Sequence, residues 1–301
     1  MNMESHSHNH SHGSNKKALL FAFLITTLFM VAEVIGGLIT NSLALLSDAG
    51  HMLSDAVSLG LSLLALVVGE KAATKAKTFG FKRFEILAAL FNGVTLIVVS
   101  IYIFYEAFHR FQEPPSVVGS GMMIIGILGL VVNIVAAWVL MRGDTKGNLN
   151  LRSAFLHVLG DMLGSIGAII AALLIIQFGW NIADPIASVI VAILILISAV
   201  RVTKESVHVL MEGSPSHIDV EKVKQQLEGI SGVIETHDLH VWTITSNYPS
   251  LSCHLLVEQN MSHEDILNDA NALMKQEFGI THTTFQIEEE HYNLEESDIH
   301  N

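Results

Sequence analysis

Residues 42–59 read SLALLSDAGHMLSDAVSL, and this stretch decides the fold class. It is apolar over most of its length, yet it contains Asp48, His51 and Asp55. An ionisable side chain inside a membrane is costly and marks a functional position by default. His51 and Asp55 are four residues apart, so they share one face of a helix. The stretch therefore predicts a membrane-spanning helix with one polar, functional face.

The same spacing recurs in residues 155–161, which read FLHVLGD and place His157 four residues before Asp161. One such pair in a membrane could be an internal hydrogen bond, but two copies on two spans favour a shared site. Two imidazoles and two carboxylates offer four ligands, and tetrahedral coordination by these groups suits Zn²⁺. The imidazoles disfavour the hard ions Ca²⁺ and Mg²⁺. We predict one metal site, made by His51, Asp55, His157 and Asp161.

Other polar or small residues of the predicted spans belong to the surroundings of this site. Asp48 lies about one turn from His51, and we interpret it as supporting a ligand or guiding the ion in, rather than as a ligand. Glu33 and Asn133 either line the same path or form hydrogen bonds between helices. The fifth span has a smooth side for close helix packing, formed by Gly160, Gly164 and Gly167.

The composition is that of a membrane protein. The chain has 301 residues, 50% of them hydrophobic, and a mean hydropathy of +0.49, which soluble domains rarely reach. Six apolar stretches each exceed the roughly 20 residues that a spanning helix needs. They make up a predicted all-α, six-helix membrane domain over residues 17–211. The spans lie at about residues 18–40, 42–68, 85–108, 117–141, 152–177 and 182–209.

The distribution of basic residues predicts the orientation of these spans. The loop between the second and third spans carries five Lys and Arg residues, and the loop between the fourth and fifth carries three. The loop after the third span holds only Arg110, and the turns after the first and fifth spans hold no base. Because basic loops stay in the cytoplasm, both termini are predicted to be cytoplasmic.

The chain becomes acidic and polar from Glu212 onward. This part has 17 acidic residues against three Lys and Arg, a net charge of −14, which argues against nucleic acid and favours cations. We expect a cytoplasmic α+β domain over residues 212–291, a split-β, ferredoxin-like sandwich of αββαβ order. Periodicity predicts helices at 217–230 and 262–279 and strands at 233–245, 251–257 and 283–289.

Both ends of the chain, residues 1–16 and 292–301, are expected to be disordered. We interpret the first as a loose metal-collecting tail, the alternatives being a purification tag or an inert tail. It carries four histidines at every second position: His6, His8, His10 and His12. Cys253 is the one cysteine, so an intrachain disulfide and a Cys₄ zinc site are excluded. We expect Cys253 to be a small packed residue.

These features together resemble the cation diffusion facilitators, and the resemblance covers nearly the whole chain. It rests on six spans, on HxxxD pairs in spans two and five, and on a terminal αββαβ domain. Residues 42–59, 79–93 (FGFKRFEILAALFNG) and 237–242 (HDLHVW) are similar to the bacterial zinc/cadmium-resistance branch. Manganese-selective relatives carry carboxylates where this chain has the two histidines, which favours zinc.

The resemblance implies a function as well as a fold. It implies a homodimer that exports Zn²⁺, Cd²⁺ or Co²⁺ across the cell membrane in exchange for protons, with no organic cofactor and no enzyme activity. Exchange has a physical basis, because a ligating imidazole must be neutral and protons therefore compete with the metal. We expect alternating access, with Zn²⁺ binding from the cytoplasm and protons displacing it outside.

Two other classes of protein fit part of this sequence, a metalloenzyme and a metal sensor. A metalloenzyme in the membrane would need an open metal position and a general base, often in an HExxH motif, and the sequence contains no such motif. A metal sensor that transports nothing would leave the ligands of the second and fifth spans without a purpose.

Relatives bind further metal in the cytoplasmic domain, near the dimer contact. The resemblance assigns His237, His254 and Glu288 as ligands there. Gln286 stands where some relatives have His, and His282 is expected to fill that gap. A bound ion would sense cytoplasmic zinc and tighten the dimer, whereas the alternative is a purely structural set of surface histidines.

Two further expectations concern residues around that domain. His237 and His240 are three apart on a strand, so they should face opposite sides of the sheet. The resemblance also implies a charge pair between Arg83 and Glu212 that ties the membrane bundle to the soluble domain. The alternative is that Arg83 merely marks the inner membrane surface. His263 starts a helix and is expected to be solvated.

Overall fold

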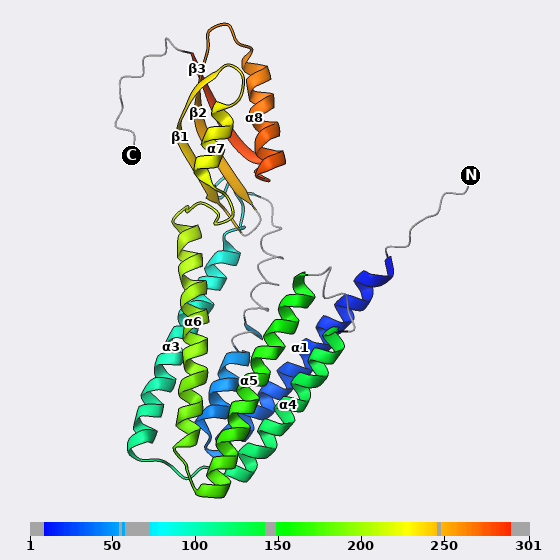
Figure 1. The fold of residues 1–301 in the computed structure, drawn as a ribbon, viewed down its shortest axis with the longest axis vertical. Helices are drawn as coiled ribbons and strands as arrows, with labels where there is room; N and C mark the ends of the chain where they lie inside the picture. The colour runs from blue at the N-terminus through cyan, green and yellow to red at the C-terminus, as the bar shows by residue number, and fades with distance from the viewer. Residues whose placement is uncertain (1–8, 54–55, 58–72, 142–148, 246–247, 290–301) are drawn as a thin grey trace, which may run out of the picture. The chain divides into compact units, whose positions relative to one another are not determined.

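The structure is a computed structural model that describes the chain except for residues 1–8, 54–55, 58–72, 142–148, 246–247 and 290–301 (Figure 1). The chain divides into two compact units. The first holds Met1–Gly60 with Phe91–Arg201, and the second holds Leu61–Leu90 with Val202–Asn301. The predicted C-terminal tail, residues 292–301, lies outside the described residues.

Five helices of the described residues are long and apolar enough to cross a membrane. The loops between them carry the polar residues and the turn-forming Gly, Pro and Asn, which explains where each helix stops. The length and apolar character of these helices therefore identify the chain as a multi-pass membrane protein. They are α1 (Asn9–Thr40), α3 (Phe84–Gln112), α4 (Gly119–Met141), α5 (Leu149–Phe178) and α6 (Ala183–Leu210).

The second predicted span, residues 42–68, is described only in part. Residues 43–53 are helical, and we call them the 43–53 helix. Residues 54–55 and 58–68 of this span lie outside the described residues, so the sixth spanning helix is not among those counted above.

Residues 1–16 were expected to be disordered, but helix α1 already begins at Asn9. Once the apolar segment has nucleated a helix, each further residue adds one backbone hydrogen bond, so the helix extends into the polar residues before it.

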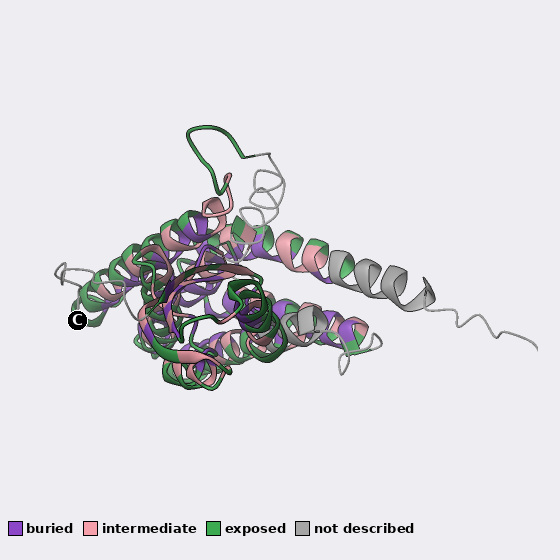
Figure 2. Cartoon of the chain, turned by 90° about the horizontal axis from the view of Figure 1, so that it is seen from above, coloured by how far each residue is buried: buried purple, intermediate pink, exposed green. Residues whose placement is uncertain are grey.

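The spanning helices bury one side and expose the other (Figure 2). Helix α4 is apolar all round, so its packing side is set by small residues at helical spacing, among them Gly126, Gly129 and Ala136. A Cβ atom on Gly129 would lie 2.6 Å from the ring of Phe29 in α1, and one on Gly126 would lie 3.0 Å from Ile169 in α5. These glycines thus allow the helices to approach closely.

The second unit contains a three-stranded sheet with two helices. The strands are β1 (Val233–Thr243), β2 (Pro249–Val257) and β3 (His282–Glu289), and the helices are α7 (Val220–Glu228) and α8 (His263–Glu277). The αββαβ order is as predicted, but the ferredoxin-like split is not present in the described sheet. Strands β1 and β2 pair antiparallel, and β2 pairs directly with β3 in parallel. A split unit needs a strand between them, and the chain places α6 and a turn before α7 instead.

Both helices of this unit cover one face of the sheet, where their apolar sides form the core. That face carries Leu251, Cys253 and Leu255 of β2, which alternate with outward-facing residues as a strand requires. Asp219 caps α7 and Ser262 caps α8 by accepting backbone N–H bonds. The opposite face of the sheet is left to polar side chains.

Candidate metal sites

The 43–53 helix packs antiparallel against α5. Ala44 and Leu45 share a buried cluster with Ala168 and Ala172. Further along the 43–53 helix, the Asp48 carboxylate contacts Gly164, which comes earlier in α5. Rising numbers on one helix thus meet falling numbers on the other, so the two helices run in opposite directions.

Two of the four predicted membrane ligands have side chains that the structure describes. Asp161 of α5 is buried, and His51 of the 43–53 helix is half-buried. Asp55 lies outside the described residues, and for His157 only the place in the α5 backbone is described. The structure therefore does not test whether all four meet at one point.

Buried polar residues of several helices surround this part of α5. Glu33 of α1 lies within hydrogen-bonding reach of Asp48 and close to Asp161. Asn133 of α4 and Ser165 of α5 are each 1% exposed. Because polar groups are costly in an apolar bundle, their shared burial marks a polar interior rather than lipid-facing positions.

A fixed cap holds the N-terminal end of the 43–53 helix. Asp184 of α6 is fully buried, and its carboxylate accepts hydrogen bonds from the Leu43 N–H at 2.8 Å and the Ala44 N–H at 3.1 Å. It also accepts the Ser42 hydroxyl at 2.6 Å, while that hydroxyl accepts the Leu45 N–H at 3.2 Å. Asp184 thus does from another helix what an N-cap residue usually does locally.

Arg110 of α3 balances the charge of this carboxylate. Its Nη1 lies 3.6 Å from Oδ2 of Asp184 and donates to the Asn41 carbonyl at 2.7 Å. Its Nε donates to Glu106 at 3.0 Å. Asp184 is not among the residues predicted from the sequence, although an acidic residue at the start of an apolar span is itself a signal.

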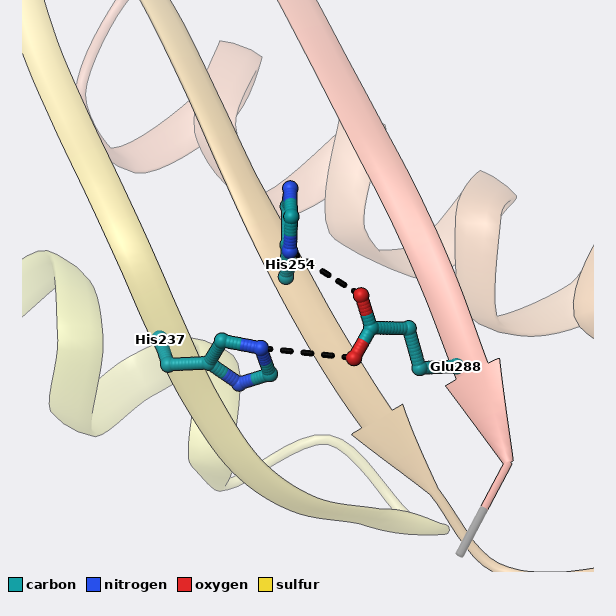
Figure 3. Close-up of side chains that lie close together, drawn as sticks. All are labelled: His237, His254 and Glu288. Atoms are coloured by element: carbon teal, nitrogen blue, oxygen red, sulfur yellow. Dashed lines mark ion pairs between the residues drawn. The ribbon is translucent and has the colours of Figure 1, made fainter. Parts of the chain in front are cut away.

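A second group of potential ligands lies on the polar face of the sheet (Figure 3). Nδ1 of His254 lies 3.0 Å from Oε1 of Glu288, and Nε2 of His237 lies 3.3 Å from Oε2 of the same carboxylate. One ligand atom from each residue falls within 4.8 Å of the others. Two imidazoles and a carboxylate form three ligands of the type that zinc accepts. We call these three residues the sheet cluster.

Strand register brings the sheet cluster together. His237 of β1 is the direct partner of His254 in β2, and Gln286 of β3 is the partner of His254 on its other side. Glu288 lies two residues beyond Gln286, on the same face. Gln286 donates a hydrogen bond of 2.7 Å to Oε1 of Glu288, which orients the carboxylate.

The expectation that His237 and His240 face opposite sides is wrong, because β1 contains a bulge between them. His240 pairs with Ser252, two residues before His254 on β2, so both histidines lie on the polar face. Asp238 sits in the bulge with a φ of +49°.

The bulge also brings the Asp238 carboxylate into this face of the sheet. It lies 2.8 Å from Nε2 of His240 and 3.6 Å from Nε2 of His254. Sequence analysis did not single out Asp238, since strand alternation without the bulge would have turned it toward the other face.

His282 does not join the sheet cluster. It is the first residue of β3, and its partner on β2 is Ser250, four residues before His254. Its ring centroid lies 5.7 Å from those of Phe79 and Tyr248. His282 therefore does not take the place of Gln286 beside the described sheet cluster, because it lies four residues before Gln286 on β3.

The other predicted residues lie outside the sheet cluster. Arg83 and Glu212 form the expected pair, with Nη2 3.1 Å from Oε1, inside the second unit. His263 begins α8 and is exposed, with its Nε2 3.4 Å from Glu289. Cys253 is buried in the core under the sheet, as expected for a packed residue.

Comparison with known proteins agrees with this architecture. The cation efflux transmembrane domain matches residues 19–211, and the cytoplasmic domain of cation efflux proteins matches residues 215–290. The "Cadmium, cobalt and zinc/H(+)-K(+) antiporter" of Bacillus subtilis is 55% identical over 93% of this chain and 91% of its own length.

More distant relatives extend the same likeness. The "Zinc transporter ZitB" of Escherichia coli is 43% identical over 91% of this chain and 88% of its own length. The "Metal cation efflux system protein CzcD" of Cupriavidus metallidurans is 40% identical over 92% of this chain and 87% of its own length. With both halves matched and relatives aligned along almost their whole length, this chain belongs to the cation efflux family.

Proposed function

We propose that this protein exports Zn²⁺, and also Cd²⁺ and Co²⁺, in exchange for protons, working by alternating access as a homodimer in the cell membrane. The family match supports metal efflux, and relatives are named for zinc, cadmium, cobalt and proton exchange. The observation that carries the site is the antiparallel contact of Asp48 with Gly164.

That contact sets the register between the two helices that bear the HxxxD pairs. Moving one turn along each helix from this contact leads from Asp48 to His51 and from Gly164 to Asp161. If both helices continue without interruption, Asp55 and His157 would follow one turn further along. The two pairs would then fall at matching levels of an antiparallel helix pair, where two imidazoles and two carboxylates can enclose one tetrahedral ion.

Proton exchange follows from the chemistry of these ligands. Ligands must be deprotonated to bind metal, so proton binding releases the ion and metal binding releases protons. Moving two positive charges against the membrane potential costs about 4.6 kcal/mol per 100 mV, and each returning proton recovers about half of that. Exchange therefore lowers the electrical cost of export.

We further propose that the sheet cluster binds Zn²⁺ from the cytoplasm. Two imidazoles and one carboxylate converge there, and both termini are assigned to the cytoplasm by the basic loops. The part of the chain from Glu212 onward carries a charge of −14, so two copies in a dimer repel each other. Bound cations offset that repulsion and favour the dimer, which would couple cytoplasmic zinc to activity.

Zinc uptake into proteoliposomes with an imposed pH gradient tests the transport proposal. We expect the wild type to accumulate zinc only with the gradient, and Asp55→Ala and Asp161→Ala to be inactive although folded. Glu113→Gln, at an exposed position just after α3, is the matched control and should transport normally. Normal flux in both aspartate variants would overturn the site, and a wild type that moves no zinc would overturn the substrate.

A further inference from the structure

Gly164 of α5 occupies a position where the Asp48 carboxylate fills the space of a side chain. A Cβ atom on Gly164 would lie 2.6 Å from Oδ1 of Asp48 and 3.0 Å from both its Cγ and its Oδ2. Contacts shorter than 3.0 Å to a Cβ are not tolerated, so any other residue here must displace the Asp48 side chain. The three nearest atoms all belong to this one carboxylate.

The neighbouring glycines of α5 do not share this feature. A Cβ atom on Gly167 would meet no atom of the described residues within 4 Å, and the same holds for Gly160. Of the three glycines expected to form a smooth packing side, only Gly164 makes a close contact with the described residues. Gly164 therefore differs from the other two because the Asp48 carboxylate packs against it.

The contact fixes a carboxyl group beside the proposed metal ligands. Asp48 is 3% exposed and lies three residues before His51, while Gly164 lies three residues after Asp161. Residues three apart share a helix face. The side chain of Asp48 is therefore held between the two ligand-bearing helices, one turn away from one ligand on each.

We propose that Gly164 is a positioning residue of the transport site: its missing side chain seats the Asp48 carboxyl group, which in turn supports the ligands on both helices. Groups that support metal ligands without binding the ion set ligand orientation, and their loss costs about 10- to 100-fold in metal affinity. This inference rests on the proposed transport function.

The test compares Gly164→Ala with Gly167→Ala on the same helix. We expect Gly167→Ala to transport like the wild type, since its methyl group would meet no atom of the described residues within 4 Å and alanine favours helix. Gly164→Ala should raise the zinc concentration for half-maximal flux about 10-fold or more. A purely structural role would lower stability and maximal flux without that rise.

The mechanism is isolated by repeating the substitution in a chain that lacks the carboxyl group. Asp48→Ala removes all three atoms that the new methyl group would meet. If Gly164 acts through Asp48, Asp48→Ala and the Asp48→Ala/Gly164→Ala double variant should show the same zinc dependence, whereas independent effects would add. This comparison also serves if Gly164→Ala alone does not fold.

The outcomes separate the two levels of the proposal. A wild type without zinc flux contradicts the transport function itself. A wild type that transports, with Gly164→Ala and Gly167→Ala alike, overturns the role of Gly164 and leaves transport standing. A further loss in the double variant relative to Asp48→Ala shows that Gly164 does not act through Asp48, and this too overturns the inference.

Discussion

Nδ1 of His254 in β2 lies 3.0 Å from Oε1 of Glu288 in the neighbouring strand β3, which follows α8 in the chain. The contact joins the imidazole ring with a buried carboxylate, whose side chain is 5% exposed. Burial of a carboxylate is costly unless it is paired. A bound cation would supply that pairing more strongly than the histidines do alone.

The first prediction concerns zinc binding by the sheet cluster. Substitution of His254 by Ala should lower the zinc affinity of this site by about 100-fold or more, since it removes a direct ligand where even supporting groups contribute 10- to 100-fold. Calorimetric titration of the purified full-length protein, in an Asp161→Ala background that removes a proposed ligand of the membrane site, should show one fewer high-affinity zinc per chain.

His282→Ala is the matched control for that titration. His282 is also a histidine of the sheet, but it contacts Phe79 and Tyr248 rather than the sheet cluster. Zinc binding should therefore be unchanged in this variant. Equal losses from His254→Ala and His282→Ala would mean that the three residues of the cluster do not form the site.

The second prediction concerns the cap at Asp184. Asp184→Ala removes one partner of a buried ion pair and leaves Arg110 and two backbone N–H groups without it. Such a loss costs about 3–5 kcal/mol, so thermal unfolding in detergent should begin at a clearly lower temperature. Glu106→Gln breaks a partly exposed pair with the same Arg110 and should cost at most about 1 kcal/mol. Similar unfolding of the two variants would argue against the cap.

The third prediction concerns the reactivity of Cys253. Burial, helped by the nearby Asp238 carboxylate, raises the pKa of the Cys253 thiol to about 12. Only the thiolate reacts with maleimides, and at pH 8 it makes up about one part in ten thousand at that pKa, against about a quarter for a free thiol. Native protein should therefore resist labelling, with the rate rising about tenfold per pH unit up to pH 10.

Two controls define the Cys253 experiment. The unfolded chain should label rapidly, and an exposed cysteine made by Glu235→Cys in a Cys253→Ser background should label in the native state. Because the unfolded thiol ionises above about pH 8.5 and the buried thiol stays protonated up to about pH 12, the free energy of unfolding should fall as the pH rises between these values. Rapid native labelling at pH 7 would contradict the buried position.

The fourth prediction concerns the ion pair of Arg83 and Glu212, and it distinguishes an effect on zinc flux from an effect on thermal stability. Their side chains are 39% and 65% exposed, so the pair should contribute at most about 1 kcal/mol to the free energy of unfolding. Arg83→Glu places two like charges together and should lower zinc flux with little change in thermal stability. The swapped variant Arg83→Glu/Glu212→Arg should regain flux, and failure to do so would mean that the arginine acts by another contact.

The parts of this structure that depend on local pattern could be predicted from the sequence. Apolar length predicts the spanning helices α3 to α6 within a few residues, because a bilayer allows few other structures. Repetition of His and Asp at the same spacing, as in His51 and Asp55, points to a metal site without any structural knowledge. These signals need only neighbours along the chain.

The parts that depend on register could not be predicted. Strand alternation shows which residues share a face, but a single bulge at Asp238 moves His240 to the face of His237. The position of His282 along β3 relative to His254 follows from strand pairing, which no local pattern contains. The seat of Asp48 on Gly164 is likewise a contact between distant segments.

The cap that Asp184 places on the 43–53 helix has a consequence for how the protein is made. Leu43 and Ala44 are synthesised long before α6. Their N–H groups therefore have no Asp184 carboxylate to bind until α6 has been made. Newly inserted chains then lack a fixed end on the helix that carries His51. The N-terminal end of the 43–53 helix can therefore be fixed only late in biogenesis, once α6 has been synthesised.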